Sequence, residues 1–267
     1  MLDRKKYYLQ VSLNSSLDKA RQIIADLPYS DRIIIEAGTP LIKKYGAESI
    51  SKLVWWWQQK SNLINSTISQ QTSNIQPNAF DLITMLMNPE NNKFVKKKNL
   101  QQQKITTTIK PYIVADLKCM DRGETEAEIA AHAGASAAVV LGSAPTETIN
   151  CFITTCKKLG IDSMVDMMAI NQPIKILRQL KTLPTVVILH RGVDETEDNK
   201  SKILPIHQIN KIKGSYNTMI AIAGGDKPRE IQSAIFNGAN IVIVWKDFYT
   251  QTSHTTNIAN DFLKQIK

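Results

Sequence analysis

The feature that most constrains the fold is a regular alternation of short apolar runs with helix-length stretches along most of the chain. Eight runs rich in β-branched residues have the length and boundaries of buried strands. They are Tyr7–Leu13, Arg32–Glu36, Tyr112–Asp116, Ala137–Leu141, Ser163–Met167, Thr185–Leu189, Met219–Ala223 and Asn240–Val244. The amphipathic stretches between them include Leu17–Leu27, Glu124–Ala133, Ile170–Lys181 and Pro228–Asn237.

This alternation predicts the architecture. Strands that are each followed by a helix pair in parallel through right-handed crossovers. Eight such units favour a closed (β/α)8 barrel of the TIM type, and 267 residues are enough to form one. A doubly wound open sheet is the alternative, but no Gly-x-Gly-x-x-Gly sequence follows the first strand.

Residues 58–110 interrupt the pattern. They are dense in Asn, Gln, Ser and Thr, and only Ala79–Met87 is apolar enough for a short helix. A loop of this length inside a compact domain is uncommon and is either functional or disordered. We therefore expect a single barrel domain over residues 1–267, with a polar and largely mobile insertion at 58–110 after the second helix. The preceding Trp55–Trp57 cannot all share one helix face, so we expect at least one to contact a second surface.

Charge and composition restrict the partners. The net charge is +9, but residues 58–110 alone hold seven Lys and no Arg against two acidic residues. No nucleic-acid-binding motif accompanies this charge, which argues against nucleic acid as a partner. Three cysteines form neither a disulfide framework nor a paired zinc pattern. With no apolar run near the ~18–20 residues of a membrane helix and no signal peptide, we expect a cytoplasmic protein without a membrane partner.

The densest group of charges is Asp116–Asp121, directly after the apolar run Pro111–Ala115. Two carboxylates and the Lys118 ammonium held close together cost free energy unless they pair or meet a metal or substrate. The segment is therefore a candidate active site, with an ordinary charged turn as the alternative. Chemistry in such barrels lies at the carboxyl ends of the strands. In order, these ends carry Asn14, Glu36, Asp116 with Lys118 and Asp121, Gly142, Asp166, His190 with Arg191, Gly224 with Gly225, and Trp245 with Lys246.

Asp116–Asp121, with the Arg122–Glu128 that follows, resembles the Asp-x-Lys-x-x-Asp signature of the orotidine 5′-phosphate decarboxylase suprafamily. The resemblance is narrower to its 3-hexulose-6-phosphate synthase branch. Segments similar to that branch extend from the first strand to the eighth. They are Leu9–Leu13, Ile35–Lys43, Val139–Gly142, His190–Asp194 and Ala221–Gly225.

One position separates the branches. Orotidylate decarboxylases carry a Lys at the second strand end, where this chain has Glu36. A carboxylate there suits a divalent metal, and Mg²⁺ prefers carboxylate, water and substrate oxygens. The resemblance thus implies Glu36 and Asp116 as Mg²⁺ ligands in a lyase that adds formaldehyde reversibly to ribulose 5-phosphate through an enediolate. Alternatives are 3-keto-L-gulonate 6-phosphate decarboxylase, orotidylate decarboxylase, and a non-catalytic binding barrel.

The resemblance also implies roles for other residues. His190 would move the C1 proton, Lys118 would lie over the enediolate, and Asp121 would reach the neighbouring subunit's site in a homodimer with shared active sites. Substrate binding falls to residues at four further strand ends, namely Asn14, Arg191, Gly224, Gly225 and Lys246.

Two positions depart from the family pattern. Asn14 replaces an Asp and so loses a charge beside Lys118, which puts turnover in question. Trp245 and Lys246 replace a Gly-Arg or Gly-Gly pair. Lys246 can supply positive charge to a phosphate, but Trp245 cannot offer the close backbone approach of Gly.

Overall fold

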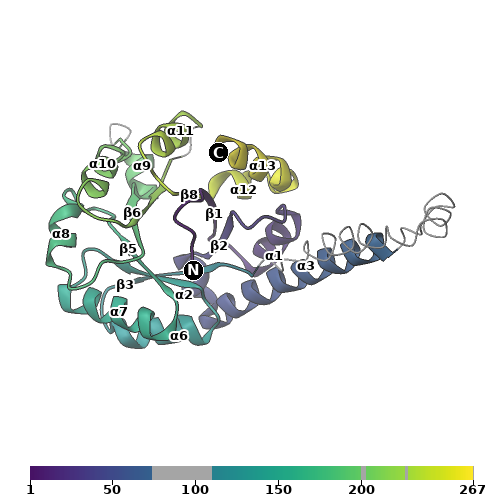
Figure 1. Cartoon of the computed structure of the whole chain (residues 1–267), viewed down its shortest axis with the longest axis horizontal. Helices are drawn as coiled ribbons and strands as arrows, with labels where there is room; N and C mark the ends of the chain where they lie inside the picture. Colours follow the sequence, from purple (N-terminus) through teal and green to yellow (C-terminus); the bar gives the residue numbers. More distant parts are fainter. Residues whose placement is uncertain (74–109, 200–202, 226–227, 267) are drawn as a thin grey trace, which may run out of the picture. The chain divides into compact units, whose positions relative to one another are not determined.

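The computed structural model describes residues 1–73, 110–199, 203–225 and 228–266, and the side chains of 65–73 are outside this description. The chain divides into two compact units, Met1–Trp57 with Pro111–Lys267, and Gln58–Lys110. Eight strands of the first unit form a closed barrel in sequence order, with β1 hydrogen-bonded to β8. Every neighbouring pair is parallel, as the alternation predicted. The (β/α)8 prediction is confirmed, and Figure 1 shows the helices around the strands.

The strands lie within a few residues of their predicted positions. They are β1 (Tyr8–Leu13), β2 (Ile33–Ala37), β3 (Ile113–Cys119), β4 (Ala137–Leu141), β5 (Asp162–Asp166), β6 (Val186–His190), β7 (Met219–Ala223) and β8 (Ile241–Val244).

Helices follow the strands in turn. They are α1 (Leu17–Asp26), α2 (Thr39–Tyr45), α3 (Ala47–Ser73), α6 (Gly123–His132), α7 (Thr146–Leu159), α8 (Pro173–Gln179), α9 (Val193–Asp198), α10 (His207–Lys213), α11 (Pro228–Phe236), α12 (Lys246–Thr250), the 3₁₀ helix η2 (Thr252–His254) and α13 (Thr255–Gln265). Among the described helices, none is long and apolar enough to cross a membrane.

Strand β3 is longer than predicted. The expected end at Asp116 lies inside it, and the strand continues to Cys119. Its pairing with β4 shifts register between Ala115 and Cys119, and Lys118 has a left-handed backbone with φ of 51°. A bulge of this kind re-aims side chains at a barrel rim. Asp116 and Lys118 are therefore part of the strand, and only Met120 and Asp121 of the charged segment follow it.

The described part of the insertion also differs from the prediction. Helix α3 begins at Ala47 and continues to Ser73, so residues 58–73 are helical where irregular structure was expected. Gln and Lys are good helix formers although they are polar, so the helix can continue through this polar segment. The short helix predicted at Ala79–Met87 lies outside the described residues. Of the three tryptophans, Trp57 is buried, Trp56 is half-buried and Trp55 is 54% exposed.

Alternation along the strands separates two apolar clusters. One face of each strand packs against the helices. The other face fills the barrel interior with residues such as Ile34, Val114, Met164 and Ile188. Because side chains alternate with a period of two, positions two residues further on share the interior face. These positions are Glu36, Asp116, Asp166 and His190, so the apolar interior gives way to ionisable groups at the carboxyl end.

Candidate active site

A cavity of about 470 Å³ opens at the carboxyl ends of the strands. Eight of the ten predicted site residues line it, together with Asp166 and Trp245. The eight are Asn14, Glu36, Asp116, Lys118, His190, Arg191, Gly224 and Lys246. The barrel thus brings together residues that span more than 230 positions of the sequence.

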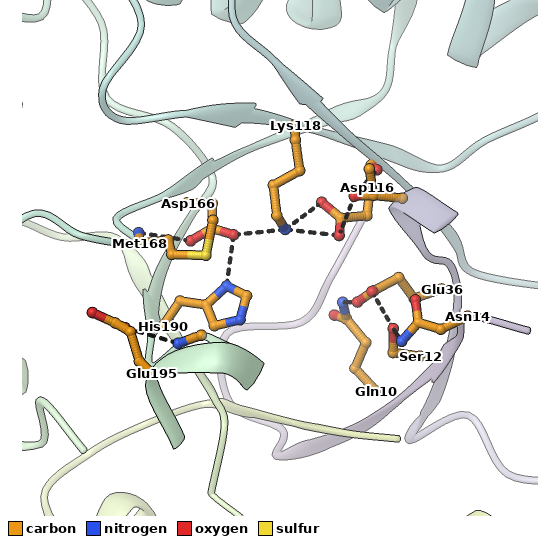
Figure 2. A network of polar contacts seen from close by, with 12 residues as sticks. Gln10, Ser12, Asn14, Glu36, Asp116, Lys118, Asp166, Met168, His190 and Glu195 are labelled. Carbon is orange, nitrogen blue, oxygen red and sulfur yellow. Dashed lines mark hydrogen bonds and ion pairs between the residues drawn. The ribbon is translucent and has the colours of Figure 1, made fainter. Parts of the chain in front are cut away.

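Lys118 is held between two carboxylates. Its Nζ donates to Asp116 Oδ1 at 2.9 Å and to Asp116 Oδ2 at 2.8 Å, and it lies 2.8 Å from Asp166 Oδ2 (Figure 2). Burial alone lowers the pKa of this ammonium, but Asp116 and Asp166 outweigh it and raise the pKa above the ordinary 10.5. Lys118 is therefore a fixed positive charge rather than a proton donor near neutral pH.

Asp166 joins Lys118 to His190. Its Oδ2 also lies 2.8 Å from His190 Nδ1, and its Oδ1 accepts from the Met168 N–H at 2.9 Å. Burial raises the pKa of Asp166, yet His190 and Lys118 together lower it to about 2. Burial lowers the pKa of His190, but the contact with Asp166 outweighs burial, so the pKa is raised above its ordinary 6.5. Because Nδ1 faces Asp166, Nε2 remains for chemistry in the cavity that His190 lines.

Glu36 lies on the other side of the cavity, on β2. Its two carboxylate oxygens accept hydrogen bonds from Gln10 Nε2 and Ser12 Oγ on β1. Ser12 Oγ in turn accepts from Asn14 Nδ2 at 3.1 Å. Burial, followed by the charge of Asp116, raises the pKa of Glu36 from 4.5 to about 7. Glu36 thus lies near a second carboxylate with incomplete compensation of its own charge, a setting that favours a cation.

Arg191 closes the cavity toward β7. Its Nε donates to the Gly224 carbonyl at 3.1 Å, and its Nη1 lies 3.4 Å from Glu230 Oε1. Gly224 has φ of 84°, and a Cβ there would lie 2.1 Å from the Arg191 carbonyl oxygen. Glycine is therefore required at this position for the two loops to approach each other.

The β8 end carries the residues that depart from the family pattern. Lys246 Nζ lies 3.0 Å from Glu197 Oε1 and 5.6 Å from the centroid of the Trp245 ring. Trp245 also packs against Tyr249, with ring centroids 6.3 Å apart. The indole is thus fixed in the cavity wall, and the charge that was predicted to meet a phosphate is paired with a carboxylate.

Two predicted residues lie outside the cavity lining. Asp121 is exposed after the end of β3, and its carbonyl accepts from Cys119 Sγ at 3.2 Å. Gly225 is buried, and a Cβ there would lie 3.1 Å from Leu204 Cδ2. The role of Asp121 in a neighbouring subunit stays a prediction.

The sequence interpretation missed four contributors. Gln10 and Ser12 hold Glu36, and Thr39 Oγ1 donates to the Asp116 carbonyl at 2.8 Å and lies 3.0 Å from Asp116 Oδ2. Tyr249 Oη accepts from the Asn14 N–H at 2.8 Å. A signal for two of them exists in β1, because polar side chains at positions 10, 12 and 14 follow the period of a strand with one polar face.

No group of three or more His, Cys, Asp or Glu side chains in the described part of the chain has the arrangement of a metal site. Glu36 and Asp116 are a pair only. Two carboxylates still suit Mg²⁺, which keeps several waters and is completed by substrate oxygens.

The chain is similar in sequence to curated proteins. The chain is 34% identical over 266 residues to the "Bifunctional enzyme Fae/Hps" of Methanosphaera stadtmanae, covering 97% of this chain and 52% of the relative. It is 34% identical over 264 residues to the protein of the same name from Archaeoglobus fulgidus, covering 97% and 53%. The chain thus spans about half the length of the curated relatives it matches.

Solved structures share the fold. A 3-hexulose-6-phosphate synthase superposes with a TM-score of 0.67 at 24% identity, covering 97% of this chain and 100% of that one. The enzyme of that name from Salmonella typhimurium gives 0.68 at 21%, covering 97% and 98%. An orotidine 5′-monophosphate decarboxylase from Methanocaldococcus jannaschii gives 0.61 at 17%, covering 98% and 99%.

A sequence model of one family matches residues 82–249, more than half of the chain, and this range includes Asp116, Lys118, Asp166 and His190. The resemblance predicted from the motif is confirmed. The chain belongs to the orotidine 5′-phosphate decarboxylase / HUMPS family.

Proposed function

We propose that this protein is a sugar-phosphate aldehyde-lyase that adds formaldehyde reversibly to ribulose 5-phosphate, giving 3-hexulose 6-phosphate. The observation that carries the proposal is Glu36, a buried carboxylate in the same cavity as the linked Lys118, Asp166 and His190. Orotidylate decarboxylases resemble each other in carrying a Lys at the second strand end. A carboxylate there supports the metal-assisted branch instead.

His190 is the group suited to move the proton. In the direction of synthesis, its Nε2 removes a proton from C1 of ribulose 5-phosphate, and the electron pair of that bond becomes the enediolate. C1 of the enediolate then attacks the formaldehyde carbon, so that a carbon–carbon bond forms while the C2 carbonyl is restored. The formaldehyde oxygen becomes an alkoxide and takes up the proton held on His190 Nε2, so the overall proton count is unchanged. Asp166 orients the ring and stabilises its imidazolium form.

Lys118 and Asp116 act on the same enediolate in different ways. The Lys118 ammonium is pre-positioned by two carboxylates and can face the developing negative charge without reorganising. Glu36 and Asp116 would hold Mg²⁺, and the incomplete charge compensation around Glu36 supports this choice. When bound, the ion would act as a Lewis acid toward the two enediolate oxygens.

We also propose a cytoplasmic homodimer. The three cysteines Cys119, Cys151 and Cys156 are free thiols, which is the usual state in a reducing compartment. Beside Asp121, Met120 is 49% exposed, and Ile129 on α6 is 45% exposed. Exposed apolar residues next to a functional segment support a protein contact there. Sedimentation analysis of the full chain and of Met120→Ser tests this contact.

The decisive experiment is a coupled assay for formaldehyde release from 3-hexulose 6-phosphate with Mg²⁺. We expect activity in the wild type, loss of at least a hundredfold in Glu36→Gln and in Asp116→Asn, and little change in the exposed control Glu124→Gln. An inactive wild type, or full activity in both site variants, would overturn the proposal.

Parallel assays of CO₂ release from two other substrates separate the alternatives. Release of CO₂ from 3-keto-L-gulonate 6-phosphate or from orotidylate, faster than formaldehyde release, assigns the protein to a decarboxylase branch instead. A fourth reading, a non-catalytic binding barrel, draws on Asn14 and on Trp245 in the cavity wall. It predicts no turnover of any of the three substrates and no Mg²⁺ binding by calorimetry.

A further inference from the structure

A second cavity lies at the opposite end of the barrel from the candidate active site. Its volume is about 450 Å³. Thr218 and Asn240, which line it, directly precede β7 and β8, so it opens at the amino ends of these strands. We call it the amino-end cavity, and its lining is Arg4, Lys213, Gly214, Ser215, Tyr216, Asn217, Thr218, Met219 and Asn240. It shares no described lining residue with the active-site cavity.

The amino-end cavity contains two cations and, among the described residues that line it, no carboxylate. Arg4 is fixed on one side, where its Nη1 donates to the Asn217 carbonyl at 2.8 Å and to Asn217 Oδ1 at 2.7 Å. Its Nε and Nη2 have no partner in the part of the chain that the structure describes. A guanidinium anchored through one nitrogen presents its remaining N–H groups in a fixed fork, which suits an oxyanion.

Lys213, the last residue of α10, is the second cation. Its side chain lies against Gly238, where a Cβ would be 3.3 Å from Lys213 Cδ and 3.5 Å from Nζ. Burial lowers the pKa of this ammonium, and no carboxylate among the described residues pairs with it. Lys213 is exposed and has no counter-charge among the described residues, so an anion entering the cavity can pair with it.

The polar groups around the two cations are mostly donors with spare capacity. The hydroxyls of Ser215 and Tyr216 have no hydrogen-bond partner among the described residues, whereas Thr218 Oγ1 donates to the Pro184 carbonyl at 2.9 Å. Asn240 Oδ1 is occupied by the Ile220 N–H at 3.1 Å. The cavity therefore offers positive charge and hydroxyl donors while its acceptors are largely used, which is complementary to a tetrahedral oxyanion with several acceptor oxygens.

We propose that the amino-end cavity is a binding site for a phosphate dianion, either free or as the ester of a small metabolite. The cavity volume is in the range of small-molecule sites and exceeds the needs of phosphate alone. The site does not depend on the proposed aldehyde-lyase activity, since none of its residues takes part in that chemistry.

The test is a titration of the full, ¹⁵N-labelled chain with inorganic phosphate, followed by amide chemical shifts. We expect saturable shifts at Ser215, Asn217 and Thr218, resolved from any shifts at Gly192 and Gly224 of the active-site cavity. In Lys213→Met and in Arg4→Gln, binding at the amino-end amides should weaken at least tenfold. Lys211→Met is the matched control, because Lys211 is an exposed lysine on the same helix that does not line the cavity, and its binding should stay within twofold of wild type.

Three results would overturn the site. They are the absence of saturable shifts at the amino-end amides, equal shifts with potassium chloride at the same ionic strength, and unchanged binding in both Lys213→Met and Arg4→Gln. A parallel titration with ribose 5-phosphate distinguishes the two phosphate sources. Tighter binding of the ester at the same amides assigns the site to a phosphorylated metabolite, and tighter binding of inorganic phosphate assigns it to the free ion.

Discussion

Asp166 Oδ2 lies 2.8 Å from His190 Nδ1, and the same oxygen lies 2.8 Å from Lys118 Nζ. One carboxylate oxygen thus raises the pKa of two groups, the proton-transferring His190 and the cation Lys118. Asp166 is itself almost fully buried, at the end of β5. His190 and Lys118 hold its pKa at about 2, so it stays ionised throughout the pH range in which an enzyme works.

Replacing Asp166 by Asn should therefore change His190 more than it changes the shape of the site. The amide has the size of the carboxylate but no charge, so burial acts on His190 unopposed by Asp166 and its pKa should fall below the ordinary 6.5. We expect kcat to fall by about 10²–10⁴, the usual contribution of a positioned acid or base.

A pH titration of the histidine ring signals by NMR, together with steady-state kinetics, checks both expectations. Asp198→Asn on α9 is the control, because Asp198 is an exposed carboxylate on a helix that contributes Thr196 to the cavity lining. An unchanged His190 pKa in Asp166→Asn contradicts the assignment of Asp166 as its orienting group.

Glu36 gives a prediction for stability. Its pKa in the folded protein, about 7, lies above the ordinary 4.5, so the folded state binds this proton more tightly than the unfolded state does. The stabilising contribution is complete below pH 4.5 and is lost as pH rises to about 7. At about 1.4 kcal/mol per pKa unit, the loss is on the order of 3–4 kcal/mol.

Glu36→Gln should remove this pH dependence and be more stable than the wild type at pH 8 by that order. Urea denaturation at pH 5 and pH 8 measures it, with the exposed Glu124→Gln as control. Added Mg²⁺ should raise the midpoint of the wild type at pH 8 and leave Glu36→Gln unchanged. Parallel pH profiles for wild type and Glu36→Gln would show that another group carries the effect.

Much of this site followed from the sequence because barrel geometry places every strand end at one rim. The alternation of strands and helices fixes which residues come last in each strand, and Glu36, Asp116, His190 and Arg191 were found in that way. The interior face that Glu36, Asp116 and His190 share then follows from the period of two along each strand.

What could not be predicted depends on contacts between distant segments. The bulge in β3 arises from its pairing with β4, so the position of Lys118 between two carboxylates was not visible from sequence. Tyr249 reaches Asn14 across 235 positions, and nothing near either residue indicates the contact. The helix over residues 58–73 does not follow from their polar composition, because such a composition is typical of loops and also of helices rich in Gln and Lys.

The ion pair between Lys246 and Glu197 predicts a specific effect on substrate affinity. Lys246 lines the active-site cavity, but its Nζ lies 3.0 Å from Glu197 Oε1, so a substrate phosphate must compete with this carboxylate. Glu197 is 59% exposed, and such pairs contribute at most about 1 kcal/mol. Glu197→Gln should lower KM for the phosphorylated substrate by about two- to fivefold with kcat unchanged.

Asp198→Asn is the matched control for this variant too. It removes the next negative charge on α9, and Asp198 has no ion pair with Lys246 in the described part of the chain. Inhibition by inorganic phosphate should strengthen in Glu197→Gln by a similar factor. If both variants lower KM equally, general electrostatics rather than release of Lys246 is responsible.

Tyr249 predicts a coupling between α12 and the first strand. Its Oη accepts from the Asn14 N–H at 2.8 Å and the Ser15 N–H at 3.3 Å, and its ring supports Trp245. Tyr249→Phe keeps the ring but leaves two backbone donors without their acceptor, which should cost about 1–3 kcal/mol of unfolding free energy.

Because Asn14 Nδ2 also donates to Ser12 Oγ beside Glu36, the loosened backbone should lower kcat/KM through the Glu36 side of the cavity. Urea denaturation and kinetics test the two effects, with Tyr45→Phe on α2 as a tyrosine control outside the cavity lining. A loss of stability without any change in kcat/KM would limit Tyr249 to a structural role. A decrease in both the unfolding free energy and kcat/KM would show that α12 positions the end of β1 for catalysis.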